Sequence, residues 1–282
     1  MLVEPRLDRA ALLDTLREHY GLAFEALRFI PVGWASAAYE VQAGDDRYFL
    51  KLWPDGRDAA GAVARLPLVL RLHELGFRVP YPVATAEGAL SASVAAGVVA
   101  LSPFLAGVTP AGWPRWPLAV LDELGRTVAG LHAATSRLSV ALPTQYVLSH
   151  ADLVGDNILV DDDGRISLLD WDEAYLAPPE LDLAMLLHGE QPTDAEAFRR
   201  ALAVYPSDVP LSEDLFAFFL LRRYLDDYTA RVLRLHQDEL DPAVEADARD
   251  GLRRWGSGQW VHLDRTLGLI RGALLENQRI GY

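Results

Sequence analysis

The sequence has no cysteine among its 282 residues. This absence excludes disulfide bonds, thiol nucleophiles, Cys-ligated zinc and iron–sulfur clusters. It suits a reducing compartment, and we expect a cytoplasmic protein. Positive charge is also scarce, because 26 Lys and Arg stand against 40 Asp and Glu, for a net charge of −14. A protein that grips the nucleic-acid backbone needs a basic face, so we expect no nucleic-acid partner.

Long apolar runs are missing as well. No stretch reaches the roughly 20 uncharged apolar residues of a membrane span, and no basic start leads into an apolar run as in a signal peptide. We therefore expect no membrane partner. Hydrophobic residues still make up 51% of the chain, which excludes global disorder. The length fits one large domain or two lobes.

Lysine is rarer than any other charged residue. Of the 26 basic residues, 25 are Arg, and the single lysine is Lys51. Arginine evidently serves wherever a generic cation suffices, whereas lysine supplies a compact point charge that can reach one oxygen. We therefore interpret Lys51 as a functional residue rather than as an ordinary exposed residue of a strand.

The spacing of apolar residues divides the chain into a strand-rich front and a helix-rich rear. The front is predicted to hold helices at 7–20 and 57–75 and strands at 27–32, 37–41, 47–53, 82–86 and 92–101. The rear is predicted to hold helices at 117–135, 180–189, 194–204, 212–236, 242–254 and 259–276. We expect an α+β fold with a β-rich N-lobe at 1–101, a hinge at 102–107 and a larger α-helical C-lobe at 108–282.

One non-helical island, residues 147–175, interrupts the helical rear. A tight loop with Asp152 and Asn157 leads into a predicted hairpin, strands 158–160 and 166–169, which Asp170 follows. The hairpin lets Asp170 face the loop, so that the oxygens of Asn157 and Asp170 converge. Two hard oxygen ligands with room for water and phosphate suit Mg²⁺.

Two plainer interpretations of the island compete with a metal site. In the first interpretation the whole segment is a polar surface hairpin. We favour a functional role, because Asp152, Asn157 and Asp170 occur together in it. The acidic run 161–164 has the composition of a calcium loop but lacks its ligand spacing and terminal Glu, so we interpret it as the hairpin turn.

Phosphoryl transfer needs a cation on the nucleotide phosphates, Mg²⁺ and a carboxylate that orients and deprotonates the acceptor hydroxyl. Lys51, a hundred residues upstream, is suited to be the cation, and Asp152 is a third carboxylate that the metal site leaves available. The acidic balance of the chain is compatible with a cationic substrate, although an acidic surface has the same composition.

The segment HADLVGDN, followed by LLDWDEAYLAPPELDLAML, resembles the catalytic and metal loops of the aminoglycoside phosphotransferases. This family is related to choline kinase and, more distantly, to eukaryotic-type protein kinases. The run DWDEAYLAPPELDL is most similar to the spectinomycin phosphotransferase branch. The resemblance is most specific over 149–187 and is supported by the strand-borne lysine. It implies a two-lobed protein-kinase-like fold.

The resemblance also implies a role for each matching residue. Asp152 would be the catalytic base, Asn157 and Asp170 would hold Mg²⁺, and Lys51 would bind the α- and β-phosphates of ATP. His150 would fix the catalytic loop through hydrogen bonds. The phosphate-covering loop would be PVGWASAAYE with Gly33 and Ser36, and residues 101–105, with Ser102 and Phe104, would contact adenine.

The chain departs from the family pattern in two places. The helix after the lysine strand has no Glu before Glu74, near its end, so the carboxylate that pairs with Lys51 is open, with Asp58 or a C-lobe carboxylate as alternatives. The common Gly after the motif histidine is Ala151.

These inferences predict an ATP- and Mg²⁺-dependent kinase that phosphorylates a hydroxyl of an aminoglycoside or aminocyclitol, and hence an antibiotic-resistance enzyme. Its acceptor would be a cationic small molecule, for which Asp226, Asp227 and Glu276 are candidate contacts. One alternative is a metabolite kinase of the same fold that acts on choline, homoserine, methylthioribose or a sugar-like alcohol. The other is a nucleotide-binding pseudokinase. A monomer and a homodimer both fit the sequence.

Overall fold

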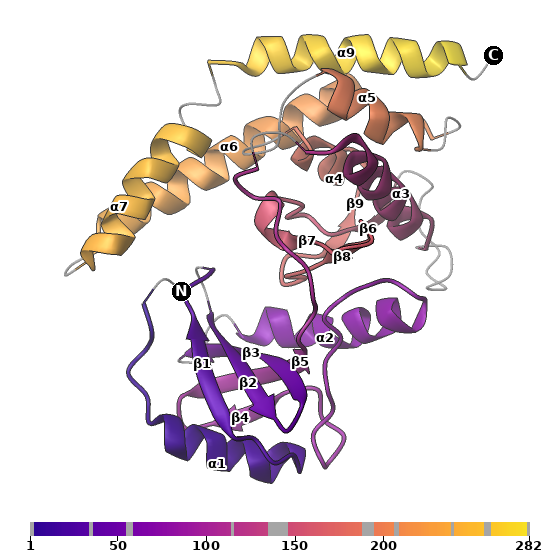
Figure 1. Ribbon diagram of the computed structural model, residues 1–282. Coiled ribbons are helices and arrows are strands. Elements are labelled where there is room, and N and C mark those ends of the chain that lie inside the picture. Colours follow the sequence, from indigo (N-terminus) through magenta and orange to yellow (C-terminus); the bar gives the residue numbers. More distant parts are fainter. Residues whose placement is uncertain are drawn as a thin grey trace. The chain divides into compact units, whose positions relative to one another are not determined.

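The computed structural model of the chain describes residues 3–33, 36–54, 59–113, 116–134, 146–187, 195–205, 209–237, 240–256 and 261–280. The chain forms two compact units, Met1–Ala106 and Gly107–Tyr282 (Figure 1). The first contains a five-stranded antiparallel sheet and the second is mostly helical, so the α+β class is confirmed. None of the helices in the described ranges is both long and apolar enough to cross a membrane.

The sheet of the first unit has the strand order β1-β2-β3-β5-β4. Its strands are β1 (Ala26–Ile30), β2 (Ala37–Ala43), β3 (Asp46–Pro54), β4 (Ala92–Val94) and β5 (Gly97–Pro103). β3 is central and pairs with β2 and β5, which places Lys51 opposite Ala38 on one side and Ala100 on the other. β5 ends inside the range expected to form the hinge, and the hinge itself stays a prediction.

Alternating residues of β3 and β5 face two different layers of core. Leu50 and Leu52 join a cluster with helix α1 (Arg9–Tyr20), whereas Trp53 and Ala100 join a second cluster with helix α2 (Ala59–Glu74). The alternation puts Lys51 on the same face as Trp53, which is the α2 face. Both helices are visible beside the sheet in Figure 1.

The predicted strand at 82–86 is wrong, and the one at 92–101 is two strands. Pro82 has no backbone N–H to donate, and around it a single hydrogen bond, from Val83 N to Leu101 O, joins this segment to β5. The apolar run of β4 and β5 is interrupted by a hairpin turn that ends at Gly97, where φ is +139°. An apolar run alone cannot reveal such a turn.

The second unit consists of helices around small two-stranded sheets. Its helices are α3 (Leu118–Ala134), α4 (Glu180–Met185), α5 (Ala195–Ala203), α6 (Glu213–Leu235), α7 (Pro242–Gly251), the π-helical η3 (Leu252–Gly256) and α9 (Leu263–Ile280). Its strands are β6 (Val147–Ser149), β7 (Ile158–Val160), β8 (Ile166–Leu168) and β9 (Tyr175–Ala177), with a 3₁₀ turn, η2 (Gly155–Asn157), before β7. α3 packs on α5, and α4 and α7 pack on α6.

The predicted hairpin of the island is confirmed, because β7 pairs with β8 and Ile158 lies opposite Leu168. The acidic run is its turn: Asp161 Oδ1 accepts hydrogen bonds from Asp163 N and Arg165 N. β6 also pairs with β9, with Ser149 opposite Tyr175, and the sequence did not predict these two strands. Strands of three residues are too short to show a period.

Gly97→Ala is expected to lower the free energy of unfolding by about 3 kcal/mol or more, which urea denaturation would measure. An added Cβ would lie 2.1 Å from Trp53 O, and φ at this position is in a region unfavourable for side chains. Gly88→Ala is the control, since Gly88 has φ +85° but open space around it. In this variant the free energy of unfolding should fall only by the cost of placing a side chain at positive φ, about 1–2 kcal/mol. Equal losses in the two variants would contradict the steric argument.

Candidate active site

The loop after β6 is anchored by one buried carboxylate, that of Asp182 on α4. Asp182 is 0% exposed. Its Oδ2 accepts a hydrogen bond from His150 N at 2.9 Å, and its Oδ1 accepts one from Ala151 N at 2.8 Å. Oδ2 also lies 3.0 Å from His132 Nε2 on α3. Three donors around one carboxylate hold the two residues that precede Asp152.

A buried polar chain continues behind this carboxylate. The ring of His132 joins Asp182 to Tyr205, whose hydroxyl lies 2.7 Å from Nδ1. With Nε2–H donating to Asp182, Nδ1 is the acceptor of the Tyr205 hydroxyl proton. Burial raises the pKa of Tyr205 well above its usual range, so the hydroxyl keeps this proton. The loop is therefore supported by fully hydrogen-bonded side chains from α3 and α4.

His150 joins the loop to the end of the hairpin. It is completely buried, and its Nε2 donates to Leu169 O at 2.7 Å while its Nδ1 accepts from Asp152 N at 3.3 Å. The ring also lies against Trp171, with centroids 4.6 Å apart. These contacts fit the loop-fixing role expected of His150, because one ring connects Asp152 to the residue before Asp170.

Asp152 and Asn157 are in direct contact. Asn157 Nδ2 donates to Asp152 Oδ2 at 2.7 Å and to Asp152 O at 2.9 Å. Leu169 N in turn donates to Asn157 O at 2.8 Å, which extends the β7–β8 ladder by one pair and leaves Asp170 as the next residue. The structure thus brings together the segments that carry all three predicted oxygen-bearing residues of the second unit.

Two residues of this site have a positive φ, Ala151 at +70° and Asp170 at +56°. They are the non-glycine residues with this conformation in the described part of the chain. An L-residue pays a steric cost there, although Asp tolerates the region better than most. Strained backbone of this kind clusters at active sites, where neighbouring contacts hold it. At Ala151 the holding contact is the hydrogen bond to Asp182.

The residues fit the magnesium ion that the sequence analysis expects. The amide of Asn157 points its Nδ2 at Asp152, which leaves the amide oxygen as its possible metal ligand. Asp170 supplies a carboxylate. The described residues contain no cluster of three or more His, Cys, Asp or Glu able to bind a metal. An amide and one carboxylate suit Mg²⁺, which keeps several water and phosphate ligands.

Arg223 of α6 is a site residue that the sequence did not indicate. Its Nη1 donates to Asp152 Oδ1 at 2.6 Å, and its Nε donates to Asp227 Oδ2 at 3.2 Å. Desolvation acts to lower the pKa of Arg223, but the charges of Asp152 and Asp227 outweigh it and raise the pKa. The guanidinium is therefore a fixed cation next to Asp152. The sequence does not single out Arg223, because it is 71 residues from Asp152 and is one of 25 arginines.

Each of the three carboxylates nominated for a cationic acceptor has an arginine partner. Asp226 lies 3.5 Å from Arg222, Glu276 lies 2.7 Å from Arg199, and Asp227 contacts both Arg223 and Arg231. Their charge is balanced within the second unit. A cationic acceptor would have to compete with these arginines.

The predicted nucleotide residues lie in the first unit. Lys51 is on β3, with Nζ 5.3 Å from the ring centroid of Trp53. Gly33 has φ +74°, as a tight loop requires, and Ser36 is buried directly before β2. Ser102 Oγ donates to Phe49 O at 3.4 Å, and Phe104 N donates to Arg47 O at 2.9 Å. Phe104 lies directly after β5, and besides this hydrogen bond its ring is covered by the Arg47 guanidinium, 4.1 Å from the ring centroid.

Glu74 lies near the end of α2 and is not expected to pair with Lys51. Its carboxylate lies 2.7 Å from Arg71. The alternative Asp58 lies outside the described residues. The assigned roles of Lys51 and of the other nucleotide residues stay predictions.

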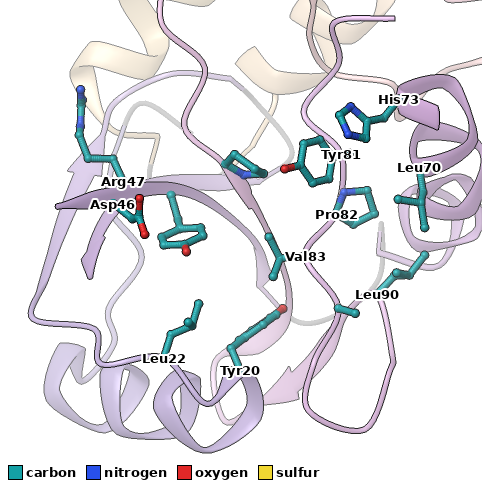
Figure 2. A pocket seen from close by; sticks show the side chains of 13 residues that line it. Tyr20, Leu22, Asp46, Arg47, Leu70, His73, Tyr81, Pro82, Val83 and Leu90 are labelled. Carbon is teal, nitrogen blue, oxygen red and sulfur yellow. The ribbon is translucent and has the colours of Figure 1, made fainter. Parts of the chain in front are cut away.

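The first unit also contains a cavity of about 630 Å³ (Figure 2). Its walls are mostly aromatic and aliphatic, and in one wall the ring of His73 stacks on Tyr81 with centroids 3.8 Å apart. Of the residues predicted to contact the nucleotide, Pro103 of segment 101–105 is the one among its lining residues. Arg47 is the one permanent cation among its thirteen lining residues, so its chemistry does not suit a triphosphate.

Solved structures share this fold. A spectinomycin phosphotransferase in complex with ADP and spectinomycin matches with a TM-score of 0.72 and 18% identity, covering 88% of this chain and 94% of its own. A macrolide 2'-phosphotransferase from Brachybacterium faecium matches at 0.61 and 19%, covering 86% and 97%. A choline kinase from Streptococcus pneumoniae matches at 0.61 and 15%, with the same coverage. No curated protein matches the chain.

The fold is that of the two-lobed, protein-kinase-like class. The sequence model of the phosphotransferase enzyme family matches residues 26–141 and 134–216, which is more than half of the chain. The chain therefore belongs to the phosphotransferase enzyme family, and both the recognised family and the predicted enzyme class are confirmed.

Asp182→Asn is expected to lower the free energy of unfolding by about 2–4 kcal/mol, because the new amide keeps one acceptor oxygen and points N–H groups at backbone donors. Urea unfolding followed by tryptophan fluorescence would measure the loss. Asp163→Asn is the control, as Asp163 is exposed in the hairpin turn and pairs with Arg165. That variant should stay within about 0.5 kcal/mol of the wild type. A loss of similar size in both would refute the anchoring role of Asp182.

Proposed function

We propose that this phosphotransferase transfers the γ-phosphate of ATP to a hydroxyl group of a small molecule, with Asp152 as the base. The observation that carries the proposal is one hydrogen-bonded set in which Asp152, Asn157 and Leu169, the neighbour of Asp170, are joined. A carboxylate beside the predicted metal ligands is what hydroxyl phosphorylation requires.

In this mechanism the chain contributes position and charge. Asp152 accepts the proton of the attacking hydroxyl through one carboxylate oxygen, while Asn157 and Arg223 fix the orientation of the carboxylate. Lys51 binds the phosphates of ATP. Asn157 and Asp170 would hold Mg²⁺, which would supply charge neutralisation on the phosphate oxygens. Since ATP is the co-substrate, we expect the protein in the cytoplasm.

We propose an aminocyclitol or aminoglycoside as the acceptor, which would make the protein a resistance enzyme. Support comes from the likeness to the spectinomycin phosphotransferase, whose structure contains spectinomycin. A second candidate is a metabolite alcohol. It is favoured by the arginine partners of Asp226, Asp227 and Glu276, since a polycation is best bound by carboxylates without such partners. A turnover screen with ATP and Mg²⁺ against spectinomycin, other aminoglycosides, choline and metabolite alcohols separates the two.

Asp152→Asn is expected to lower kcat about 10²- to 10⁴-fold, the usual contribution of a general base, with ATP affinity unchanged. Coupled-enzyme assays measure turnover, and calorimetry with ATP and Mg²⁺ measures binding. Asp162→Asn is the control, because Asp162 is an exposed carboxylate in the turn of the hairpin that follows the loop. Near-normal turnover of Asp152→Asn would show that the base is another group. ATP binding without turnover in the wild-type protein would instead indicate a pseudokinase.

Lys51→Met, unlike Asp152→Asn, should weaken ATP binding. The dissociation constant for ATP should rise at least about tenfold, because a phosphate-binding cation is lost. Lys51→Arg tests the need for a compact charge and should restore only part of the affinity. Calorimetry on all three proteins gives the comparison. Unchanged ATP affinity in Lys51→Met would remove Lys51 from the nucleotide site.

A further inference from the structure

The carboxylate of Asp152 is held on both sides. Asn157 binds Oδ2 at 2.7 Å and Arg223 binds Oδ1 at 2.6 Å. Asn157 comes from the same loop, whereas Arg223 comes from α6. The predicted base therefore has a permanent cation against one of its two oxygens.

Arg223 is itself part of an alternating row of charges. Asp227 and Arg231 follow it at intervals of four residues, which places all three on one face of α6. Asp227 Oδ2 accepts from Arg223 Nε at 3.2 Å, and Asp227 Oδ1 lies 3.2 Å from Arg231 Nη1. The row Asp152–Arg223–Asp227–Arg231 carries no net charge.

The far end of this row is held by close packing. A Cβ added at Gly251, the last residue of α7, would lie 1.8 Å from Arg231 Nε, so the absence of a side chain there makes room for Arg231. Arg231 is only 12% exposed. Held in this way, Arg231 fixes Asp227, and Asp227 fixes the guanidinium of Arg223.

Part of the Arg223 guanidinium is still available to a ligand. Nε donates to Asp227 and Nη1 to Asp152, and within the described residues Nη2 makes no further hydrogen bond. The side chain is 25% exposed, and that of Asp152 is 24% exposed. Because Arg223 Nη1 lies 2.6 Å from Asp152 Oδ1, a molecule whose hydroxyl reaches Asp152 is also close to the guanidinium.

We propose that Arg223 is a positioning and specificity-determining residue, which orients Asp152 and selects an acceptor with an oxygen-bearing group, rather than an ammonium, beside the reacting hydroxyl. The inference rests on the proposed function, because it takes Asp152 as the base. A neighbouring hydroxyl or carboxylate accepts a hydrogen bond from Nη2. An ammonium at the same place faces a like charge that Asp152 and Asp227 hold in position. Ammonium groups farther along an acceptor are not affected.

The test compares 1,2-propanediol, lactate and 1-amino-2-propanol, which share the hydroxyl on C2 and differ in the group on C1. Transfer from ATP is measured for each, and each is also tested as an inhibitor of ATP hydrolysis, so that binding is measured for every compound. Wild-type protein should prefer the diol and lactate over the aminoalcohol by at least about tenfold, in kcat/KM or in inhibition constant. Lactate separates the anionic from the neutral oxygen group.

Arg223→Gln should reduce this preference at least about tenfold and should slow ATP hydrolysis, while ATP affinity by calorimetry is unchanged. Arg223→Lys keeps the charge and should retain the preference but not the full rate. Arg222→Gln is the matched control: Arg222 is the adjacent residue, is 53% exposed and pairs with Asp226. Thermal unfolding of each variant verifies that the protein is folded.

Two results would overturn the inference: a wild-type protein that uses or binds the aminoalcohol as well as the diol, or an Arg223→Gln variant that keeps both preference and rate. The outcome is distinguishable from failure of the proposed function, which is decided by Asp152→Asn. An inactive Asp152→Asn together with an unchanged Arg223→Gln rejects the inference alone. An active Asp152→Asn rejects both.

Discussion

The geometry of the site depends on one buried interaction, the carboxylate of Asp182 with the backbone of His150 and Ala151. It compensates two N–H groups that would otherwise be buried without partners, and it holds Ala151 at a positive φ. The chain turns there, so that Asp152 follows with its side chain toward Asn157 and Arg223. α3 supports the same carboxylate through His132, which connects the loop to the helical core.

Several carboxylates of the second unit are neutralised by neighbouring arginines. The chain has 25 arginines, and Asp226 and Asp227 of α6 are each matched by an arginine four residues away. Net charge therefore says little about the acceptor, because it counts charges whose fields cancel locally. The charge that a ligand meets at Asp152 is set by the few groups in contact with it, foremost Arg223.

The sequence was sufficient to predict the α+β class, the hairpin that follows Asn157 and the family, because these depend on local periods and on a motif of closely spaced residues. It was not sufficient for β6 and β9, which have three residues each and are too short to show a period. Nor was it sufficient for the segment at 82–86, where Pro82 removes a backbone donor. Arg223 was not predicted for another reason. A contact between residues 71 positions apart leaves no pattern in a single sequence, and one arginine among 25 does not stand out as the single lysine does.

The pairing of β6 with β9 turns residues 149–175 into a closed loop, whose ends are tied to each other by the ladder at Ser149 and Tyr175. Inside it, His150 and Leu169 form a second tie. The turn of the β7–β8 hairpin, with the exposed Asp162 and Asp163, lies beyond both ties and beyond the paired residues of β7 and β8. Extra residues inserted at that turn would lengthen the loop without displacing its base, which makes it the natural place to attach a spectroscopic label or a peptide tag.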